Sequence, residues 1–256
     1  MEPAVVIDGQ PQKSKDKLCI IGCADSRKLA PFHATDEYEF WGVNNLFTST
    51  ETRPFTRWFE IHQILEKDGK WERRGQREFR GLKIERYLEY LAALDIPVYM
   101  QFKNPLVPKS VAFPWQQIVE CLGNYLTNTI SWQIALAICD GFEEIQIYGV
   151  DMAVDTEYHH QRPSCEYFLG VAAGRGIKIF LPDTSDLLKT RFLYGVHEHM
   201  ELPFRNRIND MLVSMHAQRE KAQKALLLEQ KRLHEYTGCI SAAREIDKIY
   251  KNVTGG

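Results

Sequence analysis

The segment that follows residue 148 is dense in polar and ionisable residues whose types could do chemistry. Residues 149–163 read Gly-Val-Asp-Met-Ala-Val-Asp-Thr-Glu-Tyr-His-His-Gln-Arg-Pro. A histidine here can act as a general base near neutral pH, and a neighbouring arginine can stabilise the charge of a departing phosphate. The catalytic candidates are therefore Tyr158, His159, His160 and Arg162.

Two other interpretations of this segment stay open. Asp151 or Asp155 together with one histidine could hold a metal ion, although adjacent histidines rarely point at the same ion. The segment could also be a structural or purely binding loop. We expect no metal site, and we take Asp151 as a substrate-binding candidate.

A second group of candidates follows the apolar run that ends at Gly22. A glycine allows close approach of the backbone to a ligand, and Asp25 and Ser26 come directly after it. The segment lacks the further glycines of a dinucleotide-binding fingerprint and the lysine of a P-loop. The alternative is a strand-to-helix turn in which Asp25 or Ser26 caps the helix.

Paired polar residues follow two more predicted elements. Asn44 and Asn45 come after an aromatic-rich run, and their amides could recognise a ribose or the edge of a base, or could simply form a turn. Asn128 and Thr129 precede an amphipathic helical pattern. They could cap that helix, and exposed amides at its N-terminus would also face an anionic ligand.

These candidates need a scaffold that places the ends of several strands side by side. Short apolar or aromatic runs predict strands, and apolar residues at helical spacing predict helices between them. Strands separated by helices pair in parallel through right-handed crossovers, so we predict an open, mostly parallel, doubly wound (Rossmann-like) α/β sheet. Ligands bind such sheets at the carboxyl ends of the strands. The predicted strands are 18–22, 39–43, 57–61, 97–100, 144–149 and 177–181, and the predicted helices are 83–94, 129–139 and 164–175.

The remaining segments have a different character. Residues 1–16 show no periodicity and predict a mobile lead-in, and the charged residues 66–81 predict a solvated insertion. From residue 204 the strand signals end and a long helical pattern begins, with a break at Thr237-Gly238. We therefore expect a core over 17–203 and a C-terminal helical hairpin over 204–256, which could join copies of the chain into a homo-oligomer.

Composition excludes several classes of protein. The chain has 256 residues, with 32 Lys and Arg against 34 Asp and Glu, so it lacks the basic excess of a DNA-coating protein, and a nucleic-acid ligand has no support. No apolar run approaches the length of a membrane helix, and the N-terminus lacks the pattern of a leader. We expect a cytoplasmic protein whose six scattered cysteines are reduced.

One stretch carries a family resemblance. Residues 128–152, from Asn-Thr-Ile-Ser-Trp to Tyr-Gly-Val-Asp-Met, resemble the helix, Gly-aromatic turn, strand and Gly-Ile/Val-Asp ending of bacterial sialyltransferases of the single-domain, Campylobacter-like type. The segment from Ile20 to Ser26, and Asn44, fall where that family has its glycine-rich loop and its asparagine. The resemblance covers residues 18–181. The first loop departs from it, because it reads Gly-Cys-Ala-Asp-Ser rather than Gly-Asn-Gly-Pro-Ser.

The resemblance implies a glycosyltransferase-like enzyme without a cofactor, with a nucleotide-sugar as co-substrate, of which a CMP-sugar is the family example, and an acceptor hydroxyl. No metal would take part. His160 or His159 would accept the acceptor's proton, and Tyr158 or Arg162 would assist the leaving phosphate. The nucleotide would be held by Gly22, Ser26, Asn44, Asn128 and Thr129.

Two alternative functions follow from other likenesses. Archaeal-type hydroxymethylpterin diphosphokinases share a related Gly-x-Asp-ending core, which would imply transfer of pyrophosphate from ATP with Mg²⁺. The whole chain also resembles proteins common in tailed-phage genomes. That likeness would imply a non-catalytic accessory or virion-associated protein that assembles through its C-terminal helices, in the host cytoplasm.

Overall fold

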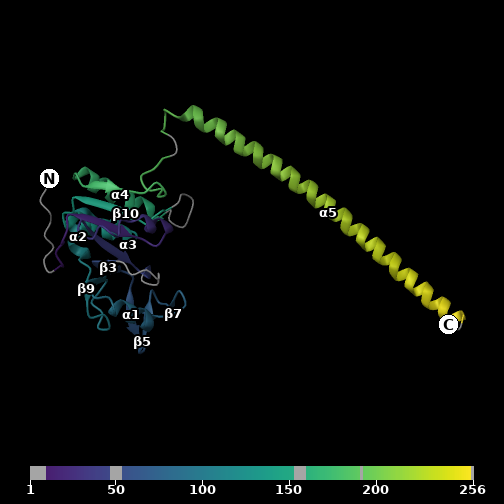
Figure 1. The fold of residues 1–256 in the computed structure, drawn as a ribbon, viewed down its shortest axis with the longest axis horizontal. Coiled ribbons are helices and arrows are strands. Elements are labelled where there is room, and N and C mark those ends of the chain that lie inside the picture. Colours follow the sequence, from purple (N-terminus) through teal and green to yellow (C-terminus); the bar gives the residue numbers. More distant parts are fainter. Residues whose placement is uncertain (1–9, 47–53, 153–159, 191–192, 255–256) are drawn as a thin grey trace. The chain divides into compact units, whose positions relative to one another are not determined.

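The computed structural model describes residues 10–46, 54–152, 160–190 and 193–254. The chain divides into two units, residues 1–189 and residues 190–256. The first unit holds an α/β core, and the second holds one long helix, α5 (Glu198–Thr254) (Figure 1).

Seven strands form the central sheet of the first unit. They lie in the order β11-β10-β1-β2-β3-β8-β9, and every neighbouring pair is parallel. The chain builds one side of the sheet outward from β1 before it crosses over to β10, so the switch point of the topology lies between β1 and β10. The predicted doubly wound α/β sheet is confirmed. Its strands are β1 (Lys17–Ile21), β2 (Tyr38–Val43), β3 (Arg57–Glu60), β8 (Val98–Met100), β9 (Ser110–Ala112), β10 (Glu144–Tyr148) and β11 (Lys178–Phe180).

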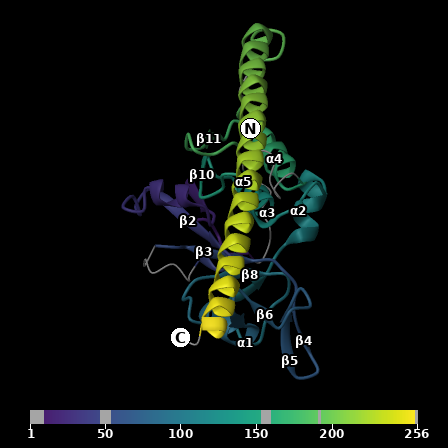
Figure 2. The ribbon, with the colours of Figure 1, turned by 90° about the vertical axis from the view of Figure 1, so that its right-hand side faces the viewer.

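Helices cover both faces of this sheet because alternate side chains of each strand point to opposite faces. In β1, Leu18 and Ile20 belong to the apolar cluster that includes residues of α2 (Trp115–Leu122), α3 (Thr129–Cys139) and α4 (Arg162–Gly174). Cys19 and Ile21 belong to the cluster built on α1 (Ile84–Ala92). Figure 2 shows α2, α3 and α4 together on one side of the strands.

Between β3 and α1 the chain forms two small antiparallel hairpins. The first joins β4 (Ile64–Lys67) to β5 (Lys70–Arg73), and the second joins β6 (Glu78–Phe79) to β7 (Leu82–Lys83). We expected a solvated insertion here. Most of its charged side chains are exposed, but the segment is folded against α1, and Arg73 is buried.

The N-terminal lead-in that we expected over residues 1–16 is in contact with the core at its end. The Lys13 Nζ atom donates a hydrogen bond to the carbonyl oxygen of Gly141 at 2.7 Å. The backbone N–H of Ser14 donates to Glu39 Oε1 at 2.5 Å, and that of Glu143 donates to the carbonyl oxygen of Asp16 at 2.8 Å. Residues 1–9 lie outside the described part of the chain.

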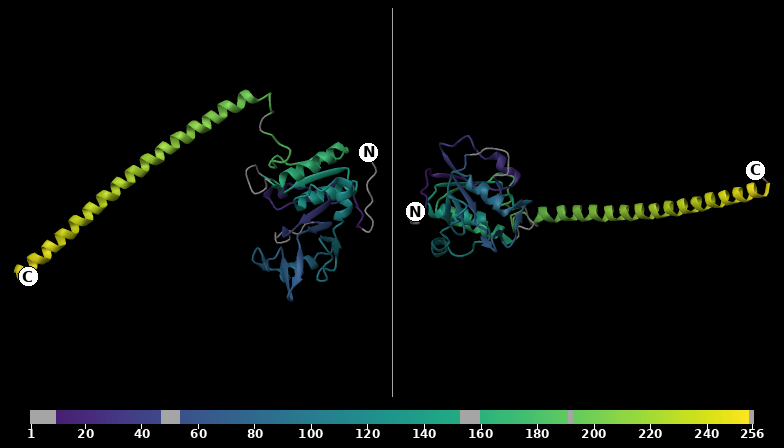
Figure 3. Two further views of the ribbon diagram at one scale, coloured as in Figure 1. Left: turned by 180° about the vertical axis from the view of Figure 1, so that it is seen from behind. Right: turned by 90° about the horizontal axis from the view of Figure 1, so that it is seen from below.

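The C-terminal segment is helical as predicted, but it is a single helix of 57 residues rather than a hairpin (Figure 3). The expected break at Thr237-Gly238 does not occur. A glycine inside a helix costs only about 1 kcal/mol relative to alanine, and Thr237 Oγ1 donates to the carbonyl oxygen of Leu233 at 2.7 Å within the helix. From residue 205 to residue 252 every side chain is exposed.

None of the helices in the described ranges is both long enough and apolar enough to span a membrane.

Candidate functional site

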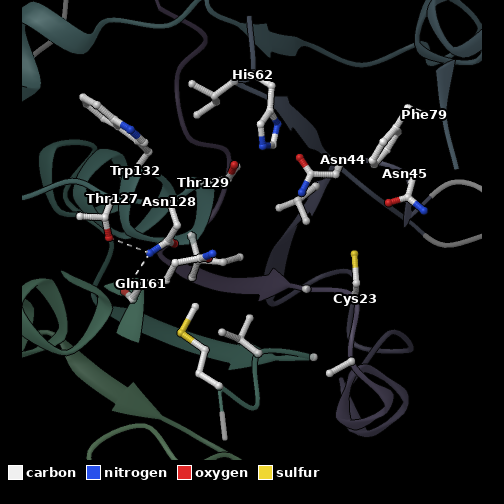
Figure 4. A pocket seen from close by; sticks show the side chains of 18 of the residues that line it. Cys23, Asn44, Asn45, His62, Phe79, Thr127, Asn128, Thr129, Trp132 and Gln161 are labelled. Carbon is white, nitrogen blue, oxygen red and sulfur yellow. Dashed lines mark hydrogen bonds between the residues drawn. The ribbon is translucent and has the colours of Figure 1, made fainter. Parts of the chain in front are cut away.

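A cavity of about 800 Å³ opens at the carboxyl ends of β1, β2, β3 and β10 (Figure 4). Parallel strands end at the same edge of a sheet, so the loops that follow them meet there. Six residues that we selected from the sequence line this cavity, and all of them follow a strand or begin a helix. They are Gly22, Asn44, Asn45, Asn128, Thr129 and Asp151.

Two glycines bring the backbone after β1 against the backbone after β10. The N–H of Gly22 donates to the carbonyl oxygen of Tyr148 at 2.7 Å, and the N–H of Ala24 donates to that of Gly149 at 2.9 Å. A Cβ atom on Gly22 would lie 2.2 Å from the Gly149 oxygen. Gly149 itself has a φ of +69°, which favours glycine. Backbone atoms therefore form this part of the cavity wall.

Asn44 lies in the middle of the cavity wall with its backbone fixed by β3. Its N–H donates to the carbonyl oxygen of Phe59 at 2.9 Å, and its own carbonyl oxygen accepts from Trp58 Nε1 at 3.1 Å. Its φ is +48°, a conformation that asparagine tolerates better than most residues. The buried side-chain oxygen Oδ1 has no hydrogen-bond partner among the described residues. A ligand donor would satisfy this oxygen.

Asn128 caps α3, and Thr129 begins that helix. The Asn128 Oδ1 atom accepts from the N–H of Ser131 at 3.0 Å, and its Nδ2 donates to the carbonyl oxygen of Gln161 at 2.9 Å (Figure 4). Of the two roles that we considered for Asn128, the structure assigns its amide to capping. Thr129 stands in the first turn of α3, where the helix dipole favours negative charge.

Ser26 and Asp25 do not line the cavity. Ser26 is buried, and its hydroxyl donates to Asp151 Oδ1 at 2.5 Å while it accepts from the N–H of Gly149 at 2.9 Å. It therefore holds the turn after β10 and does not point at a ligand. Asp25 is exposed, and its Oδ1 lies 3.6 Å from Lys28 Nζ and 3.8 Å from Arg27 Nη1.

The four catalytic candidates stay a prediction. Tyr158 and His159 lie outside the described residues. His160 is exposed and stands next to Gln161, which lines the cavity. Arg162 is not part of the cavity lining, because its guanidinium donates to Glu166 Oε1 at 2.8 Å and to the carbonyl oxygen of Asp186 at 2.5 Å.

A buried ionic cluster that no sequence pattern selected lies behind the cavity wall. Glu60, the last residue of β3, is fully buried and accepts hydrogen bonds from the hydroxyl of Tyr87, from Arg73 Nε and Nη2 at 3.2 Å, and from the N–H of His62 at 3.2 Å. Burial by itself raises the pKa of a carboxyl group. Here the hydrogen bond from His62 and the charge of Arg73 outweigh burial and hold the pKa of Glu60 below its usual value.

His62 connects this cluster to the cavity. Its Nδ1 atom lies 2.6 Å from Glu60 Oε1 and 2.6 Å from Arg73 Nη2. His62 lines the cavity (Figure 4). Because both contacts use Nδ1, the other ring nitrogen, Nε2, is available to a ligand. The position of His62 directly after a predicted strand is the signal that could have selected it.

Three arginines from the hairpin insertion also line the cavity. Arg73 is paired with Glu60, whereas Arg74 and Arg80 are exposed and make no ion pair with a described residue. Two residues of the cavity wall are therefore positively charged and have no carboxylate partner in the described part of the chain. The sequence signal for these hairpins is a dipeptide ending in glycine at six-residue spacing: Asp68-Gly69, Arg74-Gly75 and Arg80-Gly81.

Solved structures of other proteins have a fold similar to that of this chain. No protein-family model matches the sequence, and no curated protein matches it. The Campylobacter jejuni sialyltransferase CstII, solved with cytidine-5'-monophosphate, shares 12% identity over 69% of this chain and 88% of that chain, with a TM-score of 0.41. The monofunctional alpha-2,3-sialyltransferase Cst-I from the same organism shares 12% identity over 79% of this chain and 100% of that chain, also with a TM-score of 0.41. These similarities concern the fold alone.

Within the described residues, no group of three or more His, Cys, Asp and Glu side chains is arranged to hold a metal ion.

Proposed function

We propose that this chain is a transferase that binds a nucleotide-sugar in the cavity and passes the sugar to an acceptor hydroxyl. The observation that carries the proposal is the convergence of Asn44, Asn45 and Thr129 in one cavity at the switch point of a doubly wound sheet, together with Arg74 and Arg80, which make no ion pair with a described residue. At about 800 Å³ the cavity has the size of a small-molecule site.

Each part of a nucleotide-sugar has a matching group in this cavity. The free Oδ1 of Asn44 would accept a hydrogen bond from a ribose hydroxyl or from the amino group of a base. Trp132 and Phe79 line the wall and offer apolar surface to a base. The guanidinium groups of Arg74 and Arg80 would attract the phosphate.

Transfer would be a direct displacement. The acceptor oxygen attacks the anomeric carbon of the sugar, the bond from that carbon to the phosphate oxygen breaks, and the nucleotide leaves with the bonding electron pair. A histidine accepts the proton of the acceptor hydroxyl, and the residues predicted for this role are His160 and His159. The arginines would stabilise the charge of the leaving phosphate, so we propose a reaction that needs no metal.

Ligand binding tests this proposal first. Purified chain is heated with millimolar CMP, UMP, GMP or AMP, and with their nucleotide-sugars, in the presence of EDTA. A ligand present at 100 times its Kd should stabilise the folded chain by about 2.7 kcal/mol and raise Tm. If no nucleotide or nucleotide-sugar raises Tm, the proposed function is wrong.

Variants of the cavity make the test specific. Asn44→Gly removes the amide but tolerates the positive φ, so it should lower the affinity for the nucleotide without loss of fold. Asp25→Ala is the matched control, because that exposed side chain lies outside the cavity lining. Once a donor is identified, His159→Ala and His160→Ala test the predicted base. Unchanged turnover in the double variant would remove both histidines from the mechanism.

A second screen, with ATP added and Mg²⁺ in place of EDTA, separates the other functions considered for this chain. Stabilisation only by ATP together with Mg²⁺ would favour pyrophosphate transfer. A chain that binds none of these ligands but assembles through α5 would be an accessory protein.

A further inference from the structure

The hairpin insertion that forms one wall of the cavity carries three turns of one type. Each turn has two central residues, the second of which is glycine, and both central residues have positive φ. This is the pattern of a type I′ turn, in which Asn, Asp or Gly is preferred at the first position. The first positions are Asp68, Arg74 and Arg80, with φ values of 52°, 51° and 51°.

The residue at each first position differs according to where its turn lies. Asp68 occupies the turn that does not line the cavity, and it is a residue that this conformation favours. Arg74 and Arg80 occupy the two turns that do line it. A bulky residue at positive φ is uncommon, so these two arginines stand where local backbone preference would select another residue.

Arg74 and Arg80 also differ from the neighbouring arginines in their ion pairing. Arg73 pairs with buried Glu60, and Arg77 pairs with Glu72 at 3.2 Å. Neither Arg74 nor Arg80 has a carboxylate partner in the described ranges. Both residues line the same cavity, and no carboxylate of the described residues lies within ion-pair distance of either.

Arg80 belongs to one end of the cavity. The Arg80 guanidinium lies 5.9 Å from the centroid of the Phe79 ring. Desolvation raises the pKa of the Cys23 thiol, and the nearby charge of Arg80 opposes that rise. Figure 4 shows Phe79 and Cys23 on one side of the cavity, with Trp132 and Asn128 on the other. The cationic end is thus separate from the end formed by α3.

We propose that Arg74 and Arg80 bind the two phosphates of a nucleoside-diphosphate ligand, which makes the nucleotide-sugar of the proposed function a nucleoside-diphosphate sugar. The inference rests on that function. A guanidinium group donates two parallel hydrogen bonds to a phosphate, so two such groups match a diphosphate, whereas a nucleoside monophosphate offers one phosphate to the pair.

Titration calorimetry on the full chain tests the assignment with pyrophosphate, phosphate, and the nucleosides, monophosphates and diphosphates of uracil, cytosine, adenine and guanine. The wild-type chain should bind at least one nucleoside diphosphate about tenfold more tightly than its monophosphate. Arg74→Asn and Arg80→Asn keep the turn, because Asn-Gly is its preferred sequence, and remove the charge. Each should weaken diphosphate binding about tenfold and leave nucleoside binding unchanged.

Arg77→Gln is the matched control, since it removes an arginine from the same hairpins that does not line the cavity. It should bind diphosphates as the wild-type chain does. If the double variant Arg74→Asn, Arg80→Asn binds diphosphate as tightly as the wild type does, the inference is overturned. Nucleotide binding, and so the proposed function, then stands. Binding of pyrophosphate but of no nucleotide keeps the arginine site and overturns the proposed function. A wild-type chain that binds a nucleoside monophosphate but neither pyrophosphate nor any diphosphate overturns the inference alone, and one that binds none of these ligands overturns both.

Discussion

Glu60 should contribute more to the stability of the α/β core than any exposed charge. It is fully buried, and the guanidinium of Arg73, itself 7% exposed, donates to both of its oxygens. Removing one partner of a buried ion pair leaves the other charge without compensation and costs about 3–5 kcal/mol. Glu60→Gln keeps the shape and removes the charge, so we expect a loss of that size in the free energy of unfolding.

The double variant Glu60→Leu, Arg73→Leu shows how much of the loss in the free energy of unfolding comes from an unpaired buried charge. Each single leucine variant leaves one buried charge unpaired, whereas the double variant leaves none, so its loss should be well below the sum of the two single losses. Glu72→Gln is the control. Its pair with Arg77 belongs to the same hairpins but is partly exposed, and pairs of that kind contribute about 0–1 kcal/mol.

The pH dependence has a definite sign. The folded-state pKa of Glu60 lies below its unfolded value, so its contribution is complete above the unfolded pKa of about 4.3 and is lost as the pH falls through the folded-state pKa. Below pH 4.3 the wild-type chain should therefore lose stability more steeply than Glu60→Gln.

Urea denaturation followed by tryptophan fluorescence measures these effects. All five tryptophans lie between residues 41 and 132, so the signal reports the core and not α5. A loss below 1 kcal/mol in Glu60→Gln, or parallel pH profiles for the two chains, would refute the reasoning.

Three further expectations are open to direct measurement. Asn128→Ala removes the cap of α3 and should lower the free energy of unfolding by about 1 kcal/mol in urea, whereas Asn128→Ser should restore most of it. Gly149→Ala places a Cβ atom 2.5 Å from the Gly22 oxygen at a φ of +69°. It should therefore lower the free energy of unfolding by more than the roughly 1–3 kcal/mol of backbone strain alone. A Tm within about 1 °C of wild type would contradict this. Removal of residues 190–256 should convert an oligomer into a monomer in light scattering, because α5 exposes its apolar side chains; an unchanged mass would exclude α5 from assembly.

The sheet could be predicted because each of its strands has a sequence pattern of its own. Buried parallel strands are short continuous apolar runs, such as Leu18 to Ile21, and the helices between them show their own periodicity. The rule that ligands bind at strand ends then placed Gly22, Asn44 and Thr129 at one edge, and the structure brings them into one cavity.

Other features depend on contacts between distant segments, which no local pattern contains. Ser26 follows β1 as the rule requires, but its hydroxyl turns inward to Asp151, 125 positions along the chain. The hairpins between β3 and α1 looked like a solvated insertion because their charges are exposed; that Arg74 and Arg80 face the cavity depends on how the segment packs on α1. At Gly238 a weak helix former was taken for a break.

The Arg-Gly turns have a consequence for the evolution of the cavity wall. The backbone of each turn is set by the glycine and by the strand pairing on either side, and the arginine side chains contribute nothing to the apolar core. Exchanging residue 74 or 80 would therefore alter what the cavity wall presents without disturbing the scaffold. If these arginines bind the ligand as we propose, substitutions at residues 74 and 80 could change ligand selectivity while the residues that stabilise the fold stay the same.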